Sequence, residues 1–186
     1  MSTDIEPQEF KQEYQGELIP MLPSDIPADD ELLFDDPRLT KANSIYLTIQ
    51  QKYFDEIVSG KKTIEYREIK PTTYKNYLCH DEIGPIPYSP DIDWPEIEGL
   101  DLNFYNNGKF PFMVGQDINF IKFKAGATAK DMDSAVVEVE SIRMTAENRF
   151  DFIDEKFVKN PTGGQFCLWI AELHLGKVRG VYRKSK

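Results

Sequence analysis

The sequence predicts an α+β fold that is mainly β: a small β-barrel with one early helix and an irregular acidic N-terminal leader. Several short segments alternate apolar and polar residues, as strands do, and one early segment has helical spacing. Prolines and glycines separate these segments. With 186 residues and 40% hydrophobic residues, the chain is expected to form one domain with a real core. Short strands with few long connections are typical of a closed or partly open barrel.

The first 43 residues are set apart by their charge. They hold 11 acidic and 3 basic side chains, whereas residues 44–186 hold 21 acidic and 19 basic ones, so most of the net charge of −10 lies in this leader. Its prolines favour irregular structure, but Leu32, Leu33 and Phe34 favour packing over a purely solvated tail. We therefore expect a leader over 1–43 that packs on a domain over 44–186. As an alternative, the leader covers a basic cleft as a nucleic-acid mimic would.

Residues 44–68 give the clearest local pattern. Ser44–Ile49 alternates and predicts a strand, and residues 50–59 have the spacing of a helix. Gly60 is expected in left-handed backbone just past the helix end. A second strand is predicted over 63–68. Its apolar face is expected to carry Ile64 and Tyr66, and its polar face Thr63, Glu65 and Arg67.

The rest of the chain is expected to complete the barrel around a long insertion at 71–112. That insertion holds six prolines and eight aromatic residues, and loops of this length tend to be functional. Its rings, Tyr105 among them, either stack bases or pin the loop to the barrel. The predicted elements are strands over 114–124 (with a bulge), 135–142, 166–175 and 177–182, a break at Gly176, and a short helix over 146–158.

The candidate site is the charged run at residues 60–67, Gly-Lys-Lys-Thr-Ile-Glu-Tyr-Arg. A lysine beside a carboxylate can bind a phosphate or polarise a carbonyl, and an arginine can clamp a phosphate. A glutamate can accept a hydrogen bond from a base or relay a proton. These groups suit a nucleotide-binding site and also a small amidohydrolase, and a solvated turn with an exposed ion pair is the simpler alternative. The candidate ligand-binding residues are Lys61, Lys62, Thr63, Glu65, Arg67, Tyr53 and Tyr105, with Lys62 and Glu65 also the catalytic candidates.

Other kinds of site are not indicated by the sequence. The two histidines and two cysteines have no metal-binding spacing, no nucleophilic triad is visible, and no metal or cofactor is implied. His174 is interpreted as a structural histidine, and Cys79 and Cys167 as reduced thiols of a cytoplasmic protein. No stretch is apolar enough for a membrane span and no secretory signal is visible, so no membrane partner is expected.

Two stretches resemble one known family. Residues 44–67 resemble the opening of an ASCH domain, which is marked by a Gly-x-Lys-x-x-Glu-x-Arg motif. The motif positions are filled by Gly60, Lys62, Glu65 and Arg67. Residues 168–178 are similar to the closing strand of the family, so the resemblance brackets about residues 44–181. It implies a PUA-like β-barrel, because the ASCH family is a branch of the PUA-like barrels.

The resemblance implies RNA or a modified nucleotide as the ligand, bound in a cleft at the motif, because ASCH domains resemble RNA-binding modules. Some small members are amidohydrolases that act on N4-acetylcytidine, and others are described as ribonucleases. Hydrolysis of an acylated nucleoside is therefore the alternative, with Lys62 at the position of the lysine of those amidohydrolases. They carry threonine where this chain has Glu65, which favours binding over turnover. A protein-interaction module is the second alternative, and the sequence leaves the oligomeric state open.

Overall fold

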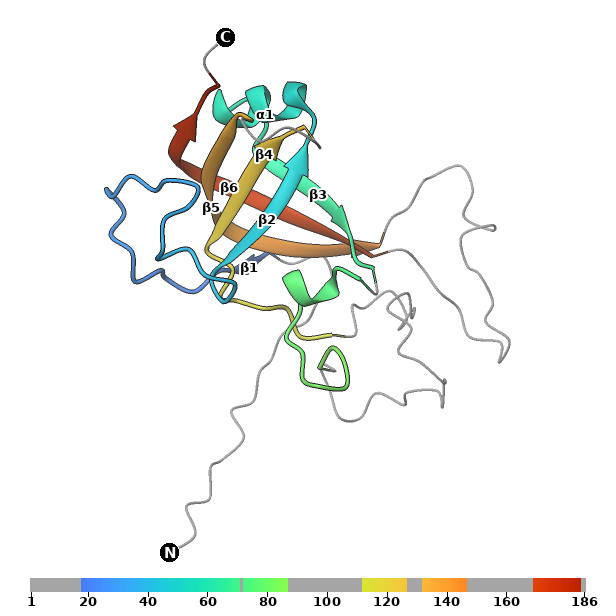
Figure 1. Ribbon diagram of the computed structural model, residues 1–186. Helices are drawn as coiled ribbons and strands as arrows, with labels where there is room; N and C mark the ends of the chain where they lie inside the picture. Colours follow the sequence, from blue (N-terminus) through green and yellow to red (C-terminus); the bar gives the residue numbers. More distant parts are fainter. Residues whose placement is uncertain (1–17, 71, 87–111, 127–131, 147–168, 185–186) are drawn as a thin grey trace, which may run out of the picture.

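The computed structural model describes residues 18–70, 72–86, 112–126, 132–146 and 169–184 (Figure 1). Its regular elements are β1 (Ile19–Pro20), β2 (Ser44–Ile49), α1 (Gln51–Val58), β3 (Ile64–Glu68), the 3-10 turn η1 (Tyr74–Asn76), β4 (Phe120–Ala125), β5 (Ser134–Ala146) and β6 (Trp169–Tyr182). No helix within these ranges is long and apolar enough to cross a membrane.

The six strands form one curled sheet, a half-barrel. Their order is β2-β4-β5-β6-β3, and β1 pairs with β5 beside this path. β2 and β4 run parallel, and the other pairs are antiparallel. Because β2 and β3 end the order, the barrel is open between them, with α1 at one end and η1 at the other (Figure 1). This architecture confirms the predicted mainly β α+β fold with one early helix.

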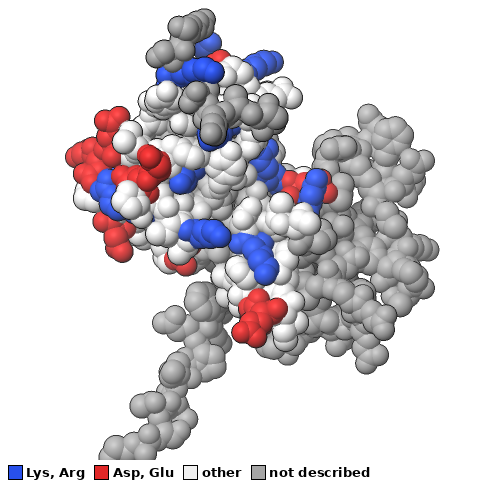
Figure 2. Space-filling view, viewed as in Figure 1, with Lys and Arg blue, Asp and Glu red and all other residues white. Residues whose placement is uncertain are grey.

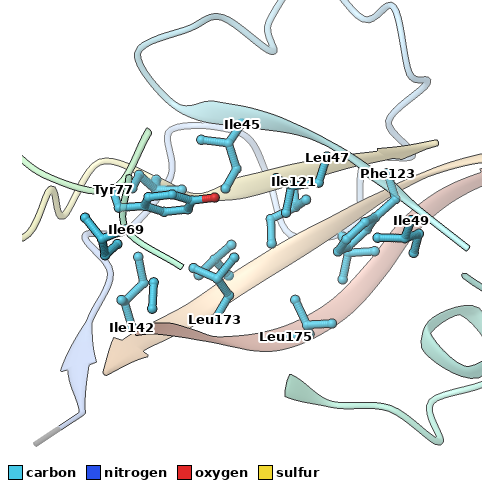
Figure 3. Packing of buried hydrophobic residues seen from close by; sticks show 14 of the residues in the cluster. Ile45, Leu47, Ile49, Ile69, Tyr77, Ile121, Phe123, Ile142, Leu173 and Leu175 are labelled. Atoms are coloured by element: carbon cyan, nitrogen blue, oxygen red, sulfur yellow. The ribbon is translucent and has the colours of Figure 1, made fainter. Parts of the chain in front are cut away.

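The hydrophobic core lies on the concave side of the sheet, where every second residue of each strand points inward. Figure 3 shows its central members, which are Ile45, Leu47, Ile49, Ile121, Phe123, Ile142, Leu173 and Leu175. Tyr77, which follows η1, lies between Ile45 of β2 and Ile69 just beyond β3 (Figure 3). The tyrosine ring therefore fills part of the open side of the barrel.

The predictions for residues 44–60 are confirmed. β2 has the predicted bounds, α1 ends one residue short of the predicted helix, and Gly60 has a φ of 73°. The residue before α1, Gln50, makes no side-chain capping hydrogen bond. A helix of eight residues without a cap is marginal by itself, so burial of Phe54 and Ile57 stabilises α1.

The alternation predicted for β3 is present, but the apolar face with Tyr66 is not the interior one that the sequence had indicated. Glu65 is 3% exposed and is the Cα partner of Leu173 in the core, whereas Tyr66 is 53% exposed. The charged residues therefore stand on the interior face of the strand. Two cations next to Glu65 compensate its burial, which period-two patterning cannot anticipate.

Two further strand predictions are corrected. β6 runs through Gly176 without a break, and register shifts in the facing part of β5 accommodate the glycine. The segment before β4 is not a strand; Val114 makes only an isolated bridge with Leu78. β4 has apolar residues on both faces because Phe120, on the convex face, packs in a second cluster with Leu32 and Val136. The predicted bulge in β4 is therefore not required.

The part of the leader described by the structure, residues 18–43, covers Phe120 on the convex side of the sheet. Leu32 has no exposed surface and packs in a second cluster with Leu39, Phe120 and Val136. The Leu32 amide donates to the Arg179 carbonyl of β6 at 3.1 Å. A side chain at Gly180 would collide with the Leu32 backbone, because a Cβ there would lie 2.1 Å from the Leu32 oxygen.

A buried arginine fixes the same part of the leader. The Arg179 guanidinium is 1% exposed. It donates to the carbonyls of Pro27 and Asp30 and lies 2.6 Å from a Glu138 carboxylate oxygen. Arginine forms five hydrogen bonds in a fixed plane, so it can bind several loop carbonyls at once. The leader backbone is thus joined to β5 and β6.

Several predictions lie outside the described residues. These are the helix over 146–158 apart from Ala146, which ends β5, and also Tyr105, Cys167 and most of the insertion. Cys79 is a free cysteine whose pKa is raised, first by burial and then by the nearby Asp117 carboxylate.

Candidate functional site

The turn after α1 positions the predicted site. The amides of Lys61 and Lys62 both donate to the Glu56 carbonyl, at 2.8 and 3.0 Å. The left-handed Gly60 permits this tight return of the chain. β3 begins directly afterwards, and the Leu175 amide of β6 donates to the Thr63 carbonyl at 2.8 Å. Lys62 is thereby held beside the first residues of β3.

Glu65 lies at the centre of the site, between two cations. Lys62 Nζ is 2.6 Å from Glu65 Oε2, and Arg67 Nη1 is 2.6 Å from Glu65 Oε1. The Lys62 contact is a close ion pair whose angles are not those of a hydrogen bond. No described residue therefore donates a hydrogen bond to Oε2. A buried carboxylate oxygen without such a donor is unusual.

Arg67 connects the two edges of the half-barrel. Its Nη2 donates to the Thr48 carbonyl of β2 at 3.3 Å, across the open side. The guanidinium therefore bridges β3 to β2 while it pairs with Glu65. We call Lys62, Glu65 and Arg67 the seam cluster, because they lie where the barrel is open.

Two tyrosines border the seam cluster. Lys62 Nζ lies 4.5 Å from the centre of the Tyr53 ring, a cation–π distance, and Tyr53 is 39% exposed. Tyr77 is buried, and burial raises the pKa of its hydroxyl to about 12. Within that pKa shift the Arg67 charge acts to lower the value and the Glu65 charge to raise it, so Tyr77 lies near both.

The structure thus brings together four of the predicted site residues: Tyr53, Lys62, Glu65 and Arg67. Lys61 and Thr63 are exposed and make no side-chain contact with the seam cluster among the described residues. Tyr105 lies outside the described residues. Tyr77 was missed by sequence reasoning, because only the packing of η1 across the open side brings it near residues 65–67.

A separate cavity of about 920 Å³ lies at the η1 end of the barrel, where β2 begins. Lys41, Lys75, Lys122, Tyr46 and Tyr77 are among its lining residues, and no member of the seam cluster is. The cavity was not anticipated from the sequence, since its residues come from the leader, β2, β4 and the insertion.

The convex face of the sheet carries another polar group. Glu172 accepts a hydrogen bond from Arg143 at 2.7 Å and one from Thr145 at 3.3 Å. His174 Nε2 is 3.8 Å from Glu172 and has no hydrogen-bond partner among the described residues. The described ranges contain no group of three or more His, Cys, Asp or Glu side chains that could hold a metal ion.

The fold and the seam cluster define a small, open β-barrel with a buried ion-pair cluster at its open side. The family model of the ASCH domain matches residues 47–83, which include α1, β3 and the whole seam cluster. This match confirms the resemblance to the ASCH family that the sequence motif indicates. Comparison with curated proteins and with solved structures found no significant match to this chain.

Proposed function

We propose that the protein binds RNA or a modified nucleotide at the seam cluster. The ASCH domain is a PUA-like domain of an RNA-binding type, and the matched segment contains all three cluster residues. The observation that carries the proposal is the buried Glu65 carboxylate, paired with two cations and with one oxygen that accepts no hydrogen bond from the described residues.

Each group of the site has a role in this proposal. Lys62 is 22% exposed and Tyr53 is 39% exposed, so a ligand meets these two before it meets Glu65. The ammonium attracts a phosphate, and the Tyr53 ring offers a surface on which a base can stack. Beside the Lys62 ammonium, Glu65 Oε2 keeps a further lone pair, which can accept a hydrogen bond from an exocyclic amine while the ion pair stays in place. Arg67 pairs with Glu65 and orients its carboxylate.

Hydrolysis ranks below binding because of the same geometry. A lysine that acts as a base must lose its proton, and Lys62 would then forfeit a 2.6 Å ion pair with Glu65. Glu65 would likewise have to leave two cations to relay a proton. A fixed ion-pair cluster suits recognition better than proton transfer.

The test is binding of labelled single-stranded RNA, measured by fluorescence anisotropy, together with cytidine and uridine monophosphates measured by calorimetry. Lys62→Ala should weaken RNA binding about tenfold, equivalent to about 1.4 kcal/mol. Lys70→Ala, just beyond β3 and outside the seam cluster, is the control. Cytidine monophosphate should bind better than uridine monophosphate, because only cytosine has an exocyclic amine, and Glu65→Gln should reduce the difference. Equal binding by wild type and Lys62→Ala would refute the proposal.

A further inference from the structure

The cavity at the η1 end of the barrel has an uneven charge. Three lysines line it, Lys41 from the leader, Lys75 from η1 and Lys122 from β4. Among the described residues that line it, Asp117 carries the only carboxylate. No described carboxylate lies within ion-pair distance of any of the three lysines, whereas Lys62, Lys70 and Lys177 elsewhere are paired. The cavity therefore presents a local positive potential despite the negative net charge of the chain.

Figure 2 shows the distribution on one face of the molecule. Acidic side chains gather over the leader, and Lys and Arg side chains spread over the neighbouring part of the face. Lys122 Nζ lies 4.8 Å from the centre of the Phe34 ring, so the leader places an aromatic side chain rather than a carboxylate beside this lysine. The described leader thus leaves Lys122 without a neutralising partner.

Neutral hydrogen-bonding groups and an aromatic surface accompany the lysines. Thr40 and Asn76 line the cavity with a hydroxyl and an amide, which are groups that can donate to phosphate or sugar oxygens. Tyr46, which also lines the cavity, is 51% exposed and offers an aromatic surface to a base. Cations, small donors and one aromatic ring are the composition of a groove that follows a single strand of nucleic acid.

One side chain connects the cavity with the seam cluster. Tyr77 lines the cavity and also lies near enough to Glu65 and Arg67 for both charges to act on its hydroxyl. The two regions therefore adjoin on the open side of the barrel, so one extended ligand can reach both.

We infer that the cavity lined by Lys41, Lys75 and Lys122 is a second binding site, for the phosphodiester backbone of a single-stranded RNA that also occupies the seam cluster. This inference rests on the proposed function, in that the seam cluster contacts one nucleotide and the cavity contacts the phosphates that follow. A free mononucleotide then uses the seam cluster alone, and an oligonucleotide uses both.

The test compares two triple variants of the full chain. K41Q/K75Q/K122Q removes the three cavity charges, and K70Q/K177Q/K184Q removes three charges outside the cavity. The probes are cytidine monophosphate, an oligocytidylate, and an abasic phosphodiester oligomer of the same length. Affinity is measured over a range of salt concentrations, and thermal melting checks that both variants fold.

The cavity variant should bind cytidine monophosphate as the wild type does, but should bind both oligomers more weakly. The slope of log affinity against log salt concentration should become shallower by about 2, because each phosphate contact on a single strand contributes about 0.7 to that slope. The control variant should keep most of the wild-type slope. Unchanged oligomer affinity in the cavity variant, an equal loss in both variants, or no binding of the abasic oligomer by wild type would each overturn the inference.

The two proposals fail in different ways. If Lys62→Ala leaves mononucleotide binding unchanged but the cavity variant loses the abasic oligomer, the cavity site stands and the proposed reading of a base at the seam cluster does not. If Lys62→Ala weakens mononucleotide binding but the cavity variant binds the abasic oligomer as the wild type does, the seam site stands and the cavity site does not.

Discussion

Lys62 Nζ lies 2.6 Å from Glu65 Oε2, although Lys62 belongs to the turn after α1 and Glu65 to β3. The ion pair joins the helix end to the edge strand and, through Arg67 and the Thr48 carbonyl, to the opposite edge β2. A buried charge at this junction has consequences for stability as well as for binding.

Glu65→Gln should destabilise the protein by about 1–3 kcal/mol, because it leaves two neighbouring cations without their shared anion. This loss of stability is smaller than that expected for a fully buried ion pair, since Lys62 and Arg67 are partly exposed. Urea unfolding measures the change. Glu68→Gln on the same strand is the control: its pair with Lys70 is exposed, so the loss should stay below about 0.5 kcal/mol. Equal losses would show that Glu65 has no special role in stability.

Incubation with N4-acetylcytidine should yield no cytidine above the uncatalysed rate, because Lys62 and Glu65 are fixed as an ion pair. Chromatography of the nucleoside products provides the measurement. Lys62→Ala and Glu65→Gln are tested in parallel. Turnover by the wild type that disappears in both variants would reverse the ranking of the two functions.

Leu32→Ala should cost about 3 kcal/mol of stability, because Leu32 of the leader is fully buried against Phe120 and Val136 of the sheet. Leu33→Ala is a matched control one residue away, where the side chain is 60% exposed, and should change stability by less than about 0.5 kcal/mol. Thermal or urea unfolding of both variants gives the comparison. A small effect of Leu32→Ala would show that the leader is dispensable for the fold.

Tyr77 should make the protein less stable as the pH rises above about 10. Its pKa is about 12 in the folded state against an ordinary value of 10.0, so the unfolded chain loses the phenolic proton first. The contribution is fully present below pH 10.0 and is lost as pH rises toward about 12. By about pH 11 the loss is about 1 kcal/mol. Tyr77→Phe should remove this part of the pH dependence in urea unfolding, whereas Tyr46→Phe, at a half-exposed tyrosine, should keep it.

The local predictions that succeeded depend on short-range pattern. The alternation of Ser44–Ile49 and the helical stripe carrying Phe54 and Ile57 specify β2 and α1, and Gly60 specifies the turn after the helix. The four motif positions also identified the ASCH resemblance, which the match over residues 47–83 confirms. These signals lie within a few residues of one another, so no knowledge of distant contacts is needed to read them.

Only the tertiary structure decided which way β3 faces and what surrounds its charges. A period-two pattern gives two faces of a strand but does not say which one is inside. Tyr66 is more apolar than Glu65, so the pattern favoured Tyr66 as the interior residue. Glu65 is inside because Lys62 and Arg67 neutralise it there, and Arg67 reaches Thr48 only because the sheet ends in β2 and β3. The cavity with Lys41, Lys75 and Lys122 likewise combines segments far apart in sequence. The sequence by itself therefore determined β2, α1, the turn at Gly60 and the motif, whereas the pairing of the strands decided the geometry of both sites.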